Sequence, residues 1–367
     1  FGPAYGNTTF KLFGRFLGKL VTDAKGNKIL PDVSVGGVPC VSSSLIEEEG
    51  SGASSGHYVT CVTPPSVPGK KTIDITANEI KSTANVLTYD YRVPEIKSIA
   101  PNDGPTYGGV VVDIHGEGLG TDYSEPLVKF GKGVVCENAK VIEPHTHLQC
   151  ILPSTVTPGA TTVSVSVNGI VSIAPTAAEI ESAPSTFNYQ PPTISVLTPG
   201  SGATYGDWEL TVTGEHFGKM HNGEEVATRV LVGGTPCLNI QIFDERKITC
   251  TTPASVPGDT KVIVEVGGVP SDPAILQSKG PAVDLVSPAF GPSYGGNTLI
   301  VSGTHLADMD RPEIDVEVFV GKQACTNVVT KSESHVECTA PSALNTQSLN
   351  IKLDVSVKIL GISTKVG

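Results

Sequence analysis

The chain contains one motif of the type that presents a catalytic nucleophile, and it stands in the wrong context for that chemistry. Gly52–Gly56 reads Gly-x-Ser-x-Gly, with Ser54 at the nucleophile position. A nucleophile elbow lies between a strand and a helix, and its acid and histidine partners follow later in the chain. Here the motif sits in a stretch rich in Glu, Gly and Ser, so we interpret it as a loop.

A second glycine motif and two groups of possible metal ligands also favour structural roles. Gly116–Gly120 resembles a phosphate-binding loop, but no helix follows to direct its N-terminus at a phosphate. His145 and His147 would share one face of a strand, yet no third ligand lies nearby. Acidic residues gather at Asp308, Asp310, Glu313, Asp315 and Glu317. They lack the glycine and the final glutamate of a helix-loop-helix calcium site, so we interpret them as a solvated loop, with calcium binding as the alternative. Glu47–Glu49 is interpreted as a solvated run.

The eight cysteines form the most specific chemical pattern. They occur as four close pairs with none left over: Cys40 and Cys61, Cys136 and Cys150, Cys237 and Cys250, Cys325 and Cys338. Zinc is the rival interpretation, but two ligands per repeat cannot complete a tetrahedral site, and no Cys-x-x-Cys occurs. We expect four local disulfides, and therefore an extracellular or cell-surface location. Each would close a loop of about 13–21 residues and contribute about 3 kcal/mol of stability.

Two further residues are candidates for roles at the surface. Asn7-Thr8-Thr9 is the one Asn-x-Ser/Thr sequence in the chain, so Asn7 is the predicted glycosylation site of a secreted eukaryotic protein. Residues 174–185 are rich in Ala, Ser and Pro and resemble stretches that carry O-linked sugar. Trp208 is the single tryptophan and aligns with strand-end positions of the other repeats. We expect it to pack locally, with a protein interface as the alternative role.

These residues are positioned by elements that occur four times. A motif close to Gly-Pro-x-Tyr-Gly recurs at Phe1–Gly6, Gly104–Gly109, Gly202–Gly206 and Phe290–Gly296. Apolar residues alternate with polar ones after each copy, which predicts antiparallel strands with one face in a core. Aromatic residues make up only 5% of the chain, whereas Gly (40) and Pro (28) are abundant, as in folds of short strands and tight turns. No capped stretch with helical periodicity occurs.

The spacing of the copies predicts separate small domains. A period of about 90–100 residues suits modules that each have their own core. Prolines mark the boundaries, which predict domains at 1–92, 93–190, 191–280 and 281–367. Because proline stiffens short links, we expect a semi-rigid rod. The first domain lacks its opening strand and the fourth its closing aromatic strand, so both are expected to be incomplete pieces of a longer protein.

The third copy carries the full set of motifs: Thr204–Gly206, Gly214–Gly218, Val232–Cys237 and Ile248–Pro253. Together these motifs resemble the IPT/TIG module, and the resemblance extends over essentially the whole chain. It implies an all-β fold of four tandem immunoglobulin-like sandwiches. The fourth copy departs from the pattern, with Ala307 in place of the turn glycine and Lys322–Ala324 in place of Gly-x-Pro. Disulfide-bearing modules of this kind are similar to those of plexin-type receptors, fibrocystin and social-amoeba adhesion and recognition proteins.

Composition and resemblance together limit the function. The net charge of −12, without any run of Lys or Arg, disfavours nucleic-acid binding. The chain has no long apolar run, so any membrane contact would involve segments outside it. We expect no catalysis and no cofactor. The resemblance implies a non-catalytic rod for cell-surface adhesion or recognition, whose partners are other proteins or copies of itself. A structural subunit of an extracellular filament is the alternative, and an accessory part of an extracellular enzyme is a third.

The incomplete first domain leads to a further expectation. The fourth repeat has an opening strand around residues 283–288, and the first repeat has no counterpart of it. A bare strand edge beside Phe10 and Leu12 would expose unpaired backbone groups. We expect preceding residues of the same chain, or a strand donated by a neighbouring chain, to cover it. Lys358–Ile362 is the candidate donor.

The cysteine pattern gives the first testable prediction. Peptide mapping of the native protein without reduction should recover four crosslinks, each within one repeat, because the pairs recur at equivalent positions. Mapping after reduction and alkylation is the control, and it should release every crosslinked peptide. A crosslink between repeats, or free thiols in the native protein, would contradict both the pairing and the oxidising location.

Overall fold

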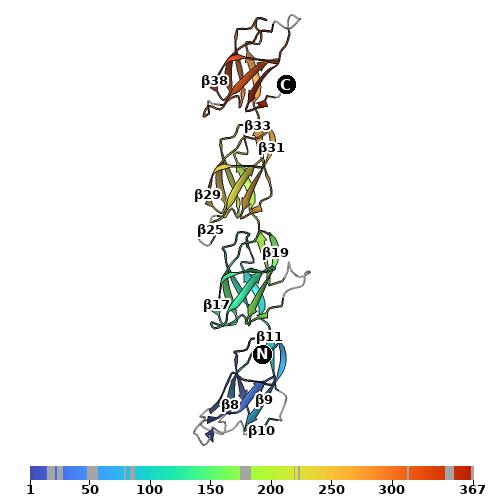
Figure 1. Cartoon of the computed structure of the whole chain (residues 1–367), viewed down its shortest axis with the longest axis vertical. Helices are drawn as coiled ribbons and strands as arrows, with labels where there is room; N and C mark the ends of the chain where they lie inside the picture. Colours follow the sequence, from blue (N-terminus) through green and yellow to red (C-terminus); the bar gives the residue numbers. More distant parts are fainter. Residues whose placement is uncertain are drawn as a thin grey trace. The chain divides into compact units, whose positions relative to one another are not determined.

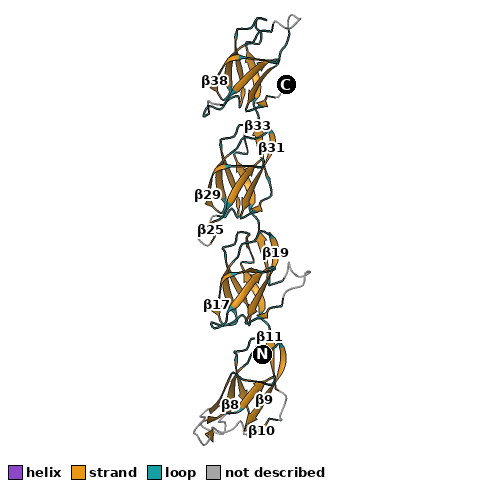
Figure 2. Ribbon diagram, in the orientation of Figure 1, coloured by secondary structure: helices purple, strands orange, loops and turns teal. Residues whose placement is uncertain are grey.

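The computed structural model describes residues 1–14, 21–22, 28–47, 57–77, 80–82, 87–173, 183–218, 220–221, 224–311, 314–343 and 351–364. Every regular element in these ranges is a β-strand (Figures 1 and 2), which confirms the expected all-β class. No helix long and apolar enough to cross a membrane is found among them. The chain groups into two compact units, Phe1–Gly104 with Gly108–Gln190, and Pro105–Tyr107 with Pro191–Gly367.

Residues 93–190 form a complete two-sheet sandwich in the first unit. One sheet has the order β12 (Glu95–Ala100), β14 (Val111–Glu117), β18 (His147–Ile151) and β17 (Glu137–Glu143). The other has the order β13 (Asp103–Pro105), β21 (Thr186–Gln190), β19 (Gly159–Val167), β15 (Pro126–Phe130) and β16 (Val134–Val135), with β20 (Ile170–Val171) paired to β19. Val163, Val165 and Val167 alternate along β19 into the core, as a period-two strand requires.

Residues 191–280 repeat this arrangement in the second unit. The first sheet has the order β22 (Thr193–Thr198), β24 (Glu209–Glu215), β30 (Lys247–Thr251) and β29 (Leu238–Asp244). The second has the order β23 (Ser201–Ala203), β33 (Ala274–Lys279), β31 (Gly258–Val266), β27 (Thr228–Val232) and β28 (Thr235–Pro236), with β32 (Val269–Pro270) paired to β31. A separate hairpin joins β25 (Met220–His221) to β26 (Glu224–Glu225).

Residues 1–92 have the same second sheet but a smaller first sheet. The second sheet has the order β1 (Gly2–Pro3), β11 (Leu87–Arg92), β9 (Gly69–Ala77), β5 (Asp32–Val35) and β6 (Val38–Pro39), with β10 (Ile80–Lys81) paired to β9. The first sheet contains β2 (Thr9–Phe13), β8 (His57–Val62) and β7 (Ser42–Glu47), and a short ladder joins β3 (Val21–Thr22) to β4 (Lys28–Ile29). Within the described ranges, no strand pairs with the outer edge of β2, where β12 pairs with β14 in the next repeat.

Residues 281–367 have a complete first sheet and a smaller second sheet. The first has the order β34 (Ala282–Ser287), β35 (Thr298–Thr304), β39 (His335–Thr339) and β38 (Thr326–Ser332). The second has the order β37 (Gln323–Ala324), β36 (Val316–Val320), β40 (Val355–Ile359) and β41 (Ile362–Ser363). In the part of this repeat that the structure describes, no strand takes the place that β33 has beside β31.

The expectation that Lys358–Ile362 could be donated to another sheet is wrong. This segment crosses from β40 to β41 in its own repeat, and Ile359 pairs with Val316. Ile359 is 2% exposed, and Leu360 and Gly361 form the turn with positive φ values of 46° and 80°. Because its backbone is already paired within its own repeat and Ile359 is buried there, the segment is not available as a donor. Apolar alternation predicts a strand but does not say which sheet the strand joins.

Each sandwich has its own buried core, and a cysteine pair lies in each. The structure joins Cys40 to Cys61, Cys136 to Cys150, Cys237 to Cys250 and Cys325 to Cys338. Their Cα atoms lie 5.6, 5.9, 5.8 and 5.8 Å apart, within the usual range for disulfides. In residues 93–190, Cys136 directly precedes β17 and Cys150 lies in β18, so the bond crosslinks neighbouring strands.

The edge of β2 that no described strand covers predicts a difference in amide hydrogen exchange. Successive amides of a strand point alternately to its two sides, so about half of those in β2 have no described strand to bond. We expect these amides to exchange much faster than those of β14, which lies between β12 and β18. Exchange measured residue by residue would check this. Equal protection of β2 and β14 would contradict a bare edge and would show that another segment or chain covers it.

Candidate functional site: the tyrosine junctions

A tight turn after the first short strand projects a tyrosine away from its own sandwich. In the first repeat, the Gly6 N–H donates to the Pro3 carbonyl at 3.0 Å, which closes a turn with Tyr5 at its third position. Equivalent bonds from Gly206 to Ala203 (3.3 Å) and from Gly295 to Pro292 (3.0 Å) place Tyr205 and Tyr294 in the same position. The recurring Gly-Pro-x-Tyr-Gly motif therefore encodes a tyrosine-bearing turn.

The glycine that follows each tyrosine holds this turn against the loop after the second cysteine. Gly6, Gly206 and Gly295 have φ values of 78°, 73° and 74°, in the region that glycine favours. A Cβ atom at these positions would lie within 2.6, 2.5 and 2.6 Å of backbone atoms of Pro64, Pro253 and Pro341. No other residue type allows this close approach, so glycine fixes where the tyrosine points.

In the first unit, Tyr5 is buried in the core of the following sandwich. It is 5% exposed and belongs to the core cluster of residues 93–190. The Gly120 N–H donates to the Tyr5 hydroxyl oxygen at 3.1 Å, and that hydroxyl lies 2.8 Å from His145 Nδ1. Burial raises the pKa of Tyr5 to about 12, so the hydroxyl stays protonated and donates a hydrogen bond to His145 Nδ1.

This geometry determines the state of His145. Because Nδ1 accepts the hydrogen bond from the Tyr5 hydroxyl, the ring is neutral and carries its proton on Nε2. His145 has a positive φ of 65°, and its N–H donates to the Gly120 carbonyl at 2.6 Å. Burial lowers the pKa of His145, which also favours the neutral ring. The Gly116–Gly120 motif and His145 thus form the receptor for a tyrosine.

Charged side chains surround this junction at its exposed rim. Glu117 forms ion pairs with Lys97 and, at 3.9 Å, with Arg92. The Arg92 guanidinium lies over the Phe1 ring, 3.9 Å from its centroid. Beside Tyr5, a cavity of about 210 Å³ is lined by both repeats, including Pro3, Glu117 and His145. The junction therefore combines a buried hydrogen-bonded centre with a solvated charged rim.

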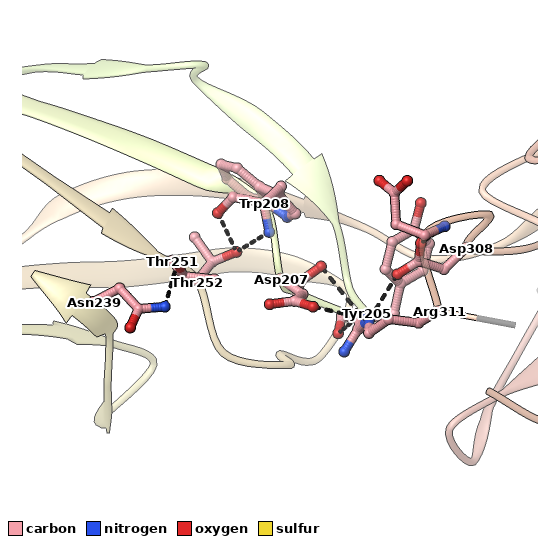
Figure 3. A network of polar contacts seen from close by, with 10 residues as sticks. Tyr205, Asp207, Trp208, Asn239, Thr251, Thr252, Asp308 and Arg311 are labelled. Carbon is pink, nitrogen blue, oxygen red and sulfur yellow. Dashed lines mark hydrogen bonds and ion pairs between the residues drawn. The ribbon is translucent and has the colours of Figure 1, made fainter. Parts of the chain in front are cut away.

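In the second unit, Tyr205 meets an arginine of the fourth repeat. The Arg311 guanidinium donates to the Tyr205 carbonyl at 3.0 Å and lies 6.0 Å from the centroid of the Tyr205 ring. Its Nε lies 2.8 Å from Asp308 Oδ2 and 3.2 Å from Asp207 Oδ2 (Figure 3). Burial, with the nearby Glu333, raises the pKa of Tyr205 to about 12. Arg311 therefore clamps the tyrosine turn through its backbone, its ring and the adjacent Asp207.

The second unit contains one more buried tyrosine of this kind. Tyr107, which groups with the second unit, is 6% exposed in a core cluster with Phe217 and Leu210. Burial, with the nearby negative charge of Glu245, raises the pKa of Tyr107. A buried tyrosine beside a Gly-x-x-Leu/Phe turn is thus a recurring feature of the chain.

The acidic loop differs from the sequence interpretation. The Asp308 side chain is 9% exposed and is paired with Arg311, so it is not a solvated charge. Glu317 pairs with Lys358 at 2.5 Å. Glu313 lies outside the described residues. Among those described, no group of three or more His, Cys, Asp and Glu side chains is placed to hold a metal ion.

The two histidines of the 145–147 segment do not share a face. His145 lies in a turn, and strand β18 begins only at His147, so the two side chains do not lie on one strand. His147 Nε2 lies 2.8 Å from Asp113 Oδ1, and its ring stacks on His115 with centroids 4.2 Å apart. His145 therefore contacts Tyr5, whereas His147 contacts Asp113 and His115.

Trp208 packs within its own repeat. Its indole N–H donates to the Ala203 carbonyl at 3.1 Å, and its ring covers Gly202, where a Cβ atom would lie 2.2 Å from the ring. Thr252 bonds the Trp208 backbone (Figure 3). These contacts give Trp208 a packing role, and its contact with a partner stays a prediction.

The remaining sequence candidates are placed in part. Asn7 is exposed and follows Gly6 with a positive φ of 61°, so its side chain is accessible, and its glycosylation stays a prediction. The Ser54 motif, Glu48–Glu49 and residues 174–182 lie outside the described residues. Sequence reasoning did not identify Tyr5, Tyr205 or Arg311 as junction residues. One feature of the sequence could have identified the tyrosines. The tyrosine recurs in every copy of the Gly-Pro-x-Tyr-Gly motif, although it does not belong to an alternating strand pattern.

Comparison with known proteins assigns the family. A sequence model described as the IPT/TIG domain matches residues 94–189, 192–277 and 281–365. The chain therefore belongs to the IPT/TIG domain family. It is 26% identical over 263 residues to zebrafish (Danio rerio) plexin A3 and 27% identical over 260 residues to human plexin-B3. These matches cover 69% and 68% of the chain and 13% of each relative, so the chain spans a small part of their length.

The full extracellular region of plexin A4 aligns with 97% of the chain and 35% of its own length, at 17% identity and a TM-score of 0.27. Together, the immunoglobulin-like fold, its four disulfides and the similarity to plexins identify an extracellular or cell-surface protein segment.

The Arg311 clamp predicts a measurable loss of stability. Arg311→Met should leave the nearly buried Asp308 without its ion pair, at a cost of about 2–3 kcal/mol in the free energy of unfolding of the second unit. Arg229→Met is the matched control. Arg229 is 62% exposed and pairs with Glu265 at the surface, so its loss should cost less than about 1 kcal/mol. Urea unfolding followed by amide exchange would measure both, and equal costs would contradict the clamp.

His145 predicts a dependence of stability on pH. The pKa of His145 is lower in the folded chain than its ordinary value of 6.5, so the unfolded chain binds this proton more readily. The contribution is complete above pH 6.5 and is lost as the pH falls below it. We expect first-unit stability, measured by urea unfolding between pH 8 and pH 5, to decline over this range. His145→Asn, which tolerates the positive φ, should make the decline shallower, and an unchanged decline would contradict the assignment.

Proposed function

We propose that the chain is a non-catalytic array of four IPT/TIG domains, at 1–92, 93–190, 191–280 and 281–367, that recognises another protein at a cell surface. The observation that carries this proposal is the tyrosine junction. Side chains that could serve chemistry, such as His145 and Asp308, are committed to holding neighbouring sandwiches together. Such junctions favour a role in presenting binding surfaces. The similarity to plexins supports an extracellular setting for that role.

The surfaces best suited to contact a partner are the loops between strands and the unpaired strand edge. Tyr123, in the loop between β14 and β15, is 94% exposed, as loops that carry recognition in sandwich folds often expose large side chains. The outer edge of β2 offers backbone groups to an extended partner segment. Both features support binding of protein and neither requires a cofactor.

Binding to intact cells tests this function. The 367-residue chain, biotinylated and assembled into tetramers to gain avidity, should stain cells of the source organism in a saturable way. An excess of unlabelled chain should compete, and mild protease treatment of the cells should abolish the signal. Chain with its disulfides reduced and alkylated is the control. Absence of saturable staining, or staining that survives protease treatment, would contradict recognition of a protein.

A filament subunit is the second candidate, and the unpaired edge of β2 is the observation that favours it. A strand of a neighbouring copy could pair there and repeat along an assembly. Sedimentation velocity distinguishes the two functions. A recognition segment should stay monomeric over a hundredfold range of concentration, whereas a filament subunit should form species whose mass grows with concentration.

The absence of catalysis gives a further prediction. Ser54→Ala should leave the measured hydrolase activity unchanged, because the next described element after the motif is strand β8, whereas an elbow leads into a helix. The unmodified chain and a buffer blank are the controls in a panel of ester, peptide and glycoside substrates. Turnover that this substitution abolishes would show that the chain is an enzyme.

A further inference from the structure

The fourth repeat projects a tyrosine that no described residue covers. Tyr294 is 72% exposed and the nearby Phe290 is 87% exposed. The equivalent residue Tyr5 is 5% exposed, and Tyr205 is partly buried. Large aromatic side chains left together at the surface mark contact sites more often than packing accidents.

The turn that carries Tyr294 is nonetheless already formed. Gly295 donates to the Pro292 carbonyl at 3.0 Å, as Gly6 does to Pro3. The carbonyl before the tyrosine is also anchored, since Ala343 donates to Ser293 at 2.7 Å. The corresponding bonds from Ser66 to Ala4 and from Ser255 to Thr204 measure 2.9 and 2.8 Å. Tyr294 is therefore held in the orientation of the buried tyrosines without a partner to hold it.

The covered tyrosines show what fits such a turn. Tyr5 and Tyr205 each pack against the turn that follows the central strand of the first sheet in the next repeat, at Gly120 and Arg311 respectively. In both receiving repeats, the buried leucine of that turn donates its N–H to a carbonyl beside the tyrosine site, from Leu119 to His145 at 3.1 Å and from Leu306 to Glu333 at 2.8 Å. The receptor is thus a common feature of the following repeat.

The second residue after each tyrosine indicates which kind of receptor fits the turn. Asp207 follows the Tyr205 turn and pairs with Arg311. At the corresponding position of the fourth repeat stands Gly296, which has no carboxylate, as Asn7 has none in the first repeat. The site at Tyr294 therefore resembles the Tyr5 junction, where a backbone N–H and a neutral ring nitrogen receive the hydroxyl, more than the arginine clamp.

The second sheet of the same repeat points to the source of the occupant. In the complete sandwiches, β21 and β33 are the strands after which the chain enters the next repeat. The place of β33 beside β40 is not filled by any strand that the structure describes. A strand that paired there would deliver its continuation beside Tyr294, just as β11 leads into the repeat that covers Tyr5.

We propose that Tyr294, with Phe290, is the docking site for a further IPT/TIG repeat of the same polypeptide. That repeat buries the tyrosine ring beside its Gly-x-x-Leu/Phe turn and donates a backbone N–H to the hydroxyl. This surface is an assembly site between repeats, and it does not depend on which partner the chain recognises.

Acetylation of tyrosines by N-acetylimidazole tests the proposal, with mass spectrometry to locate the products. In the 367-residue chain, Tyr294 and the exposed control Tyr123 should react rapidly, and Tyr5 slowly. In the whole protein isolated from its source, Tyr294 should be protected by about tenfold or more while Tyr123 reacts as before. Equal reactivity of Tyr294 and Tyr123 in the whole protein would overturn the proposal. Protection that appears in the 367-residue chain only at high concentration would assign the site to a second copy, and would overturn it as well.

An extended chain provides the second measurement. The Val357 N–H donates to the Thr364 hydroxyl oxygen, and the Thr364 N–H donates to the Val357 carbonyl at 2.8 Å, as the Ser82 N–H does to the Ile75 carbonyl. Residues 1–364 can therefore be continued in register by a second copy of residues 83–190. This addition supplies a second β11 strand and the repeat that follows it, whose Gly120 N–H and His145 ring receive a tyrosine hydroxyl. Acetylation of the original Tyr294 should fall by about tenfold. In this extended chain Tyr294→Ala should lower the urea midpoint, whereas in the 367-residue chain it should leave the midpoint unchanged. An extended chain that forms all its disulfides but leaves Tyr294 fully reactive would refute the docking site.

Discussion

A buried tyrosine hydroxyl must find hydrogen-bond partners, and the organisation of the first unit depends on that requirement. The ring of Tyr5 is removed from water by the next sandwich, and an unpaired hydroxyl there would cost about 1–3 kcal/mol. Gly120 and His145 remove that cost, one as a donor and the other as an acceptor. Because each partner has a fixed direction, the contact also fixes how the two sandwiches of this unit meet. A purely apolar contact would allow the ring to slide.

The second unit holds its tyrosine turn by different chemistry, through the backbone of the turn. Arg311 approaches the carbonyl of Tyr205 and is itself held by Asp308 and Asp207, so the charge stays paired while partly buried. A charge-assisted bond of this kind is stronger than a neutral one but needs every carboxylate in place. The two junctions therefore hold equivalent tyrosine turns in two ways, by neutral hydrogen bonds at Tyr5 and by ion pairs at Tyr205. The neutral junction responds to the protonation of His145, and the ionic junction responds to salt.

The glycine, the disulfide and the tyrosine act in turn on the tight turn, on the loop beside it and on the next sandwich. Gly6 and its equivalents allow the turn to press against the loop that follows the second cysteine. The disulfide ties that cysteine to the neighbouring strand, so the loop has a fixed position within its sheet. The tyrosine then carries this rigidity from one sandwich to the next. A chain with such joints can present loops and strand edges on a stable support, as recognition of other proteins requires.

The sequence by itself determined the strands, the tight turns, the cysteine pairs and the family, because each leaves a local signal in periodicity or in adjacent residues. Val163, Val165 and Val167 alternate along the chain just as they alternate in space. Only the tertiary structure decided which residues the tyrosines contact, that His145 accepts a hydrogen bond from Tyr5 and that Asp308 pairs with Arg311. Tyr5 and His145 are 140 residues apart, and Arg311 and Tyr205 are 106 apart. Periodicity reports which face of a strand is buried, but it does not report contacts that a side chain makes with another domain. The partner of such a side chain depends on how the next sandwich packs against it.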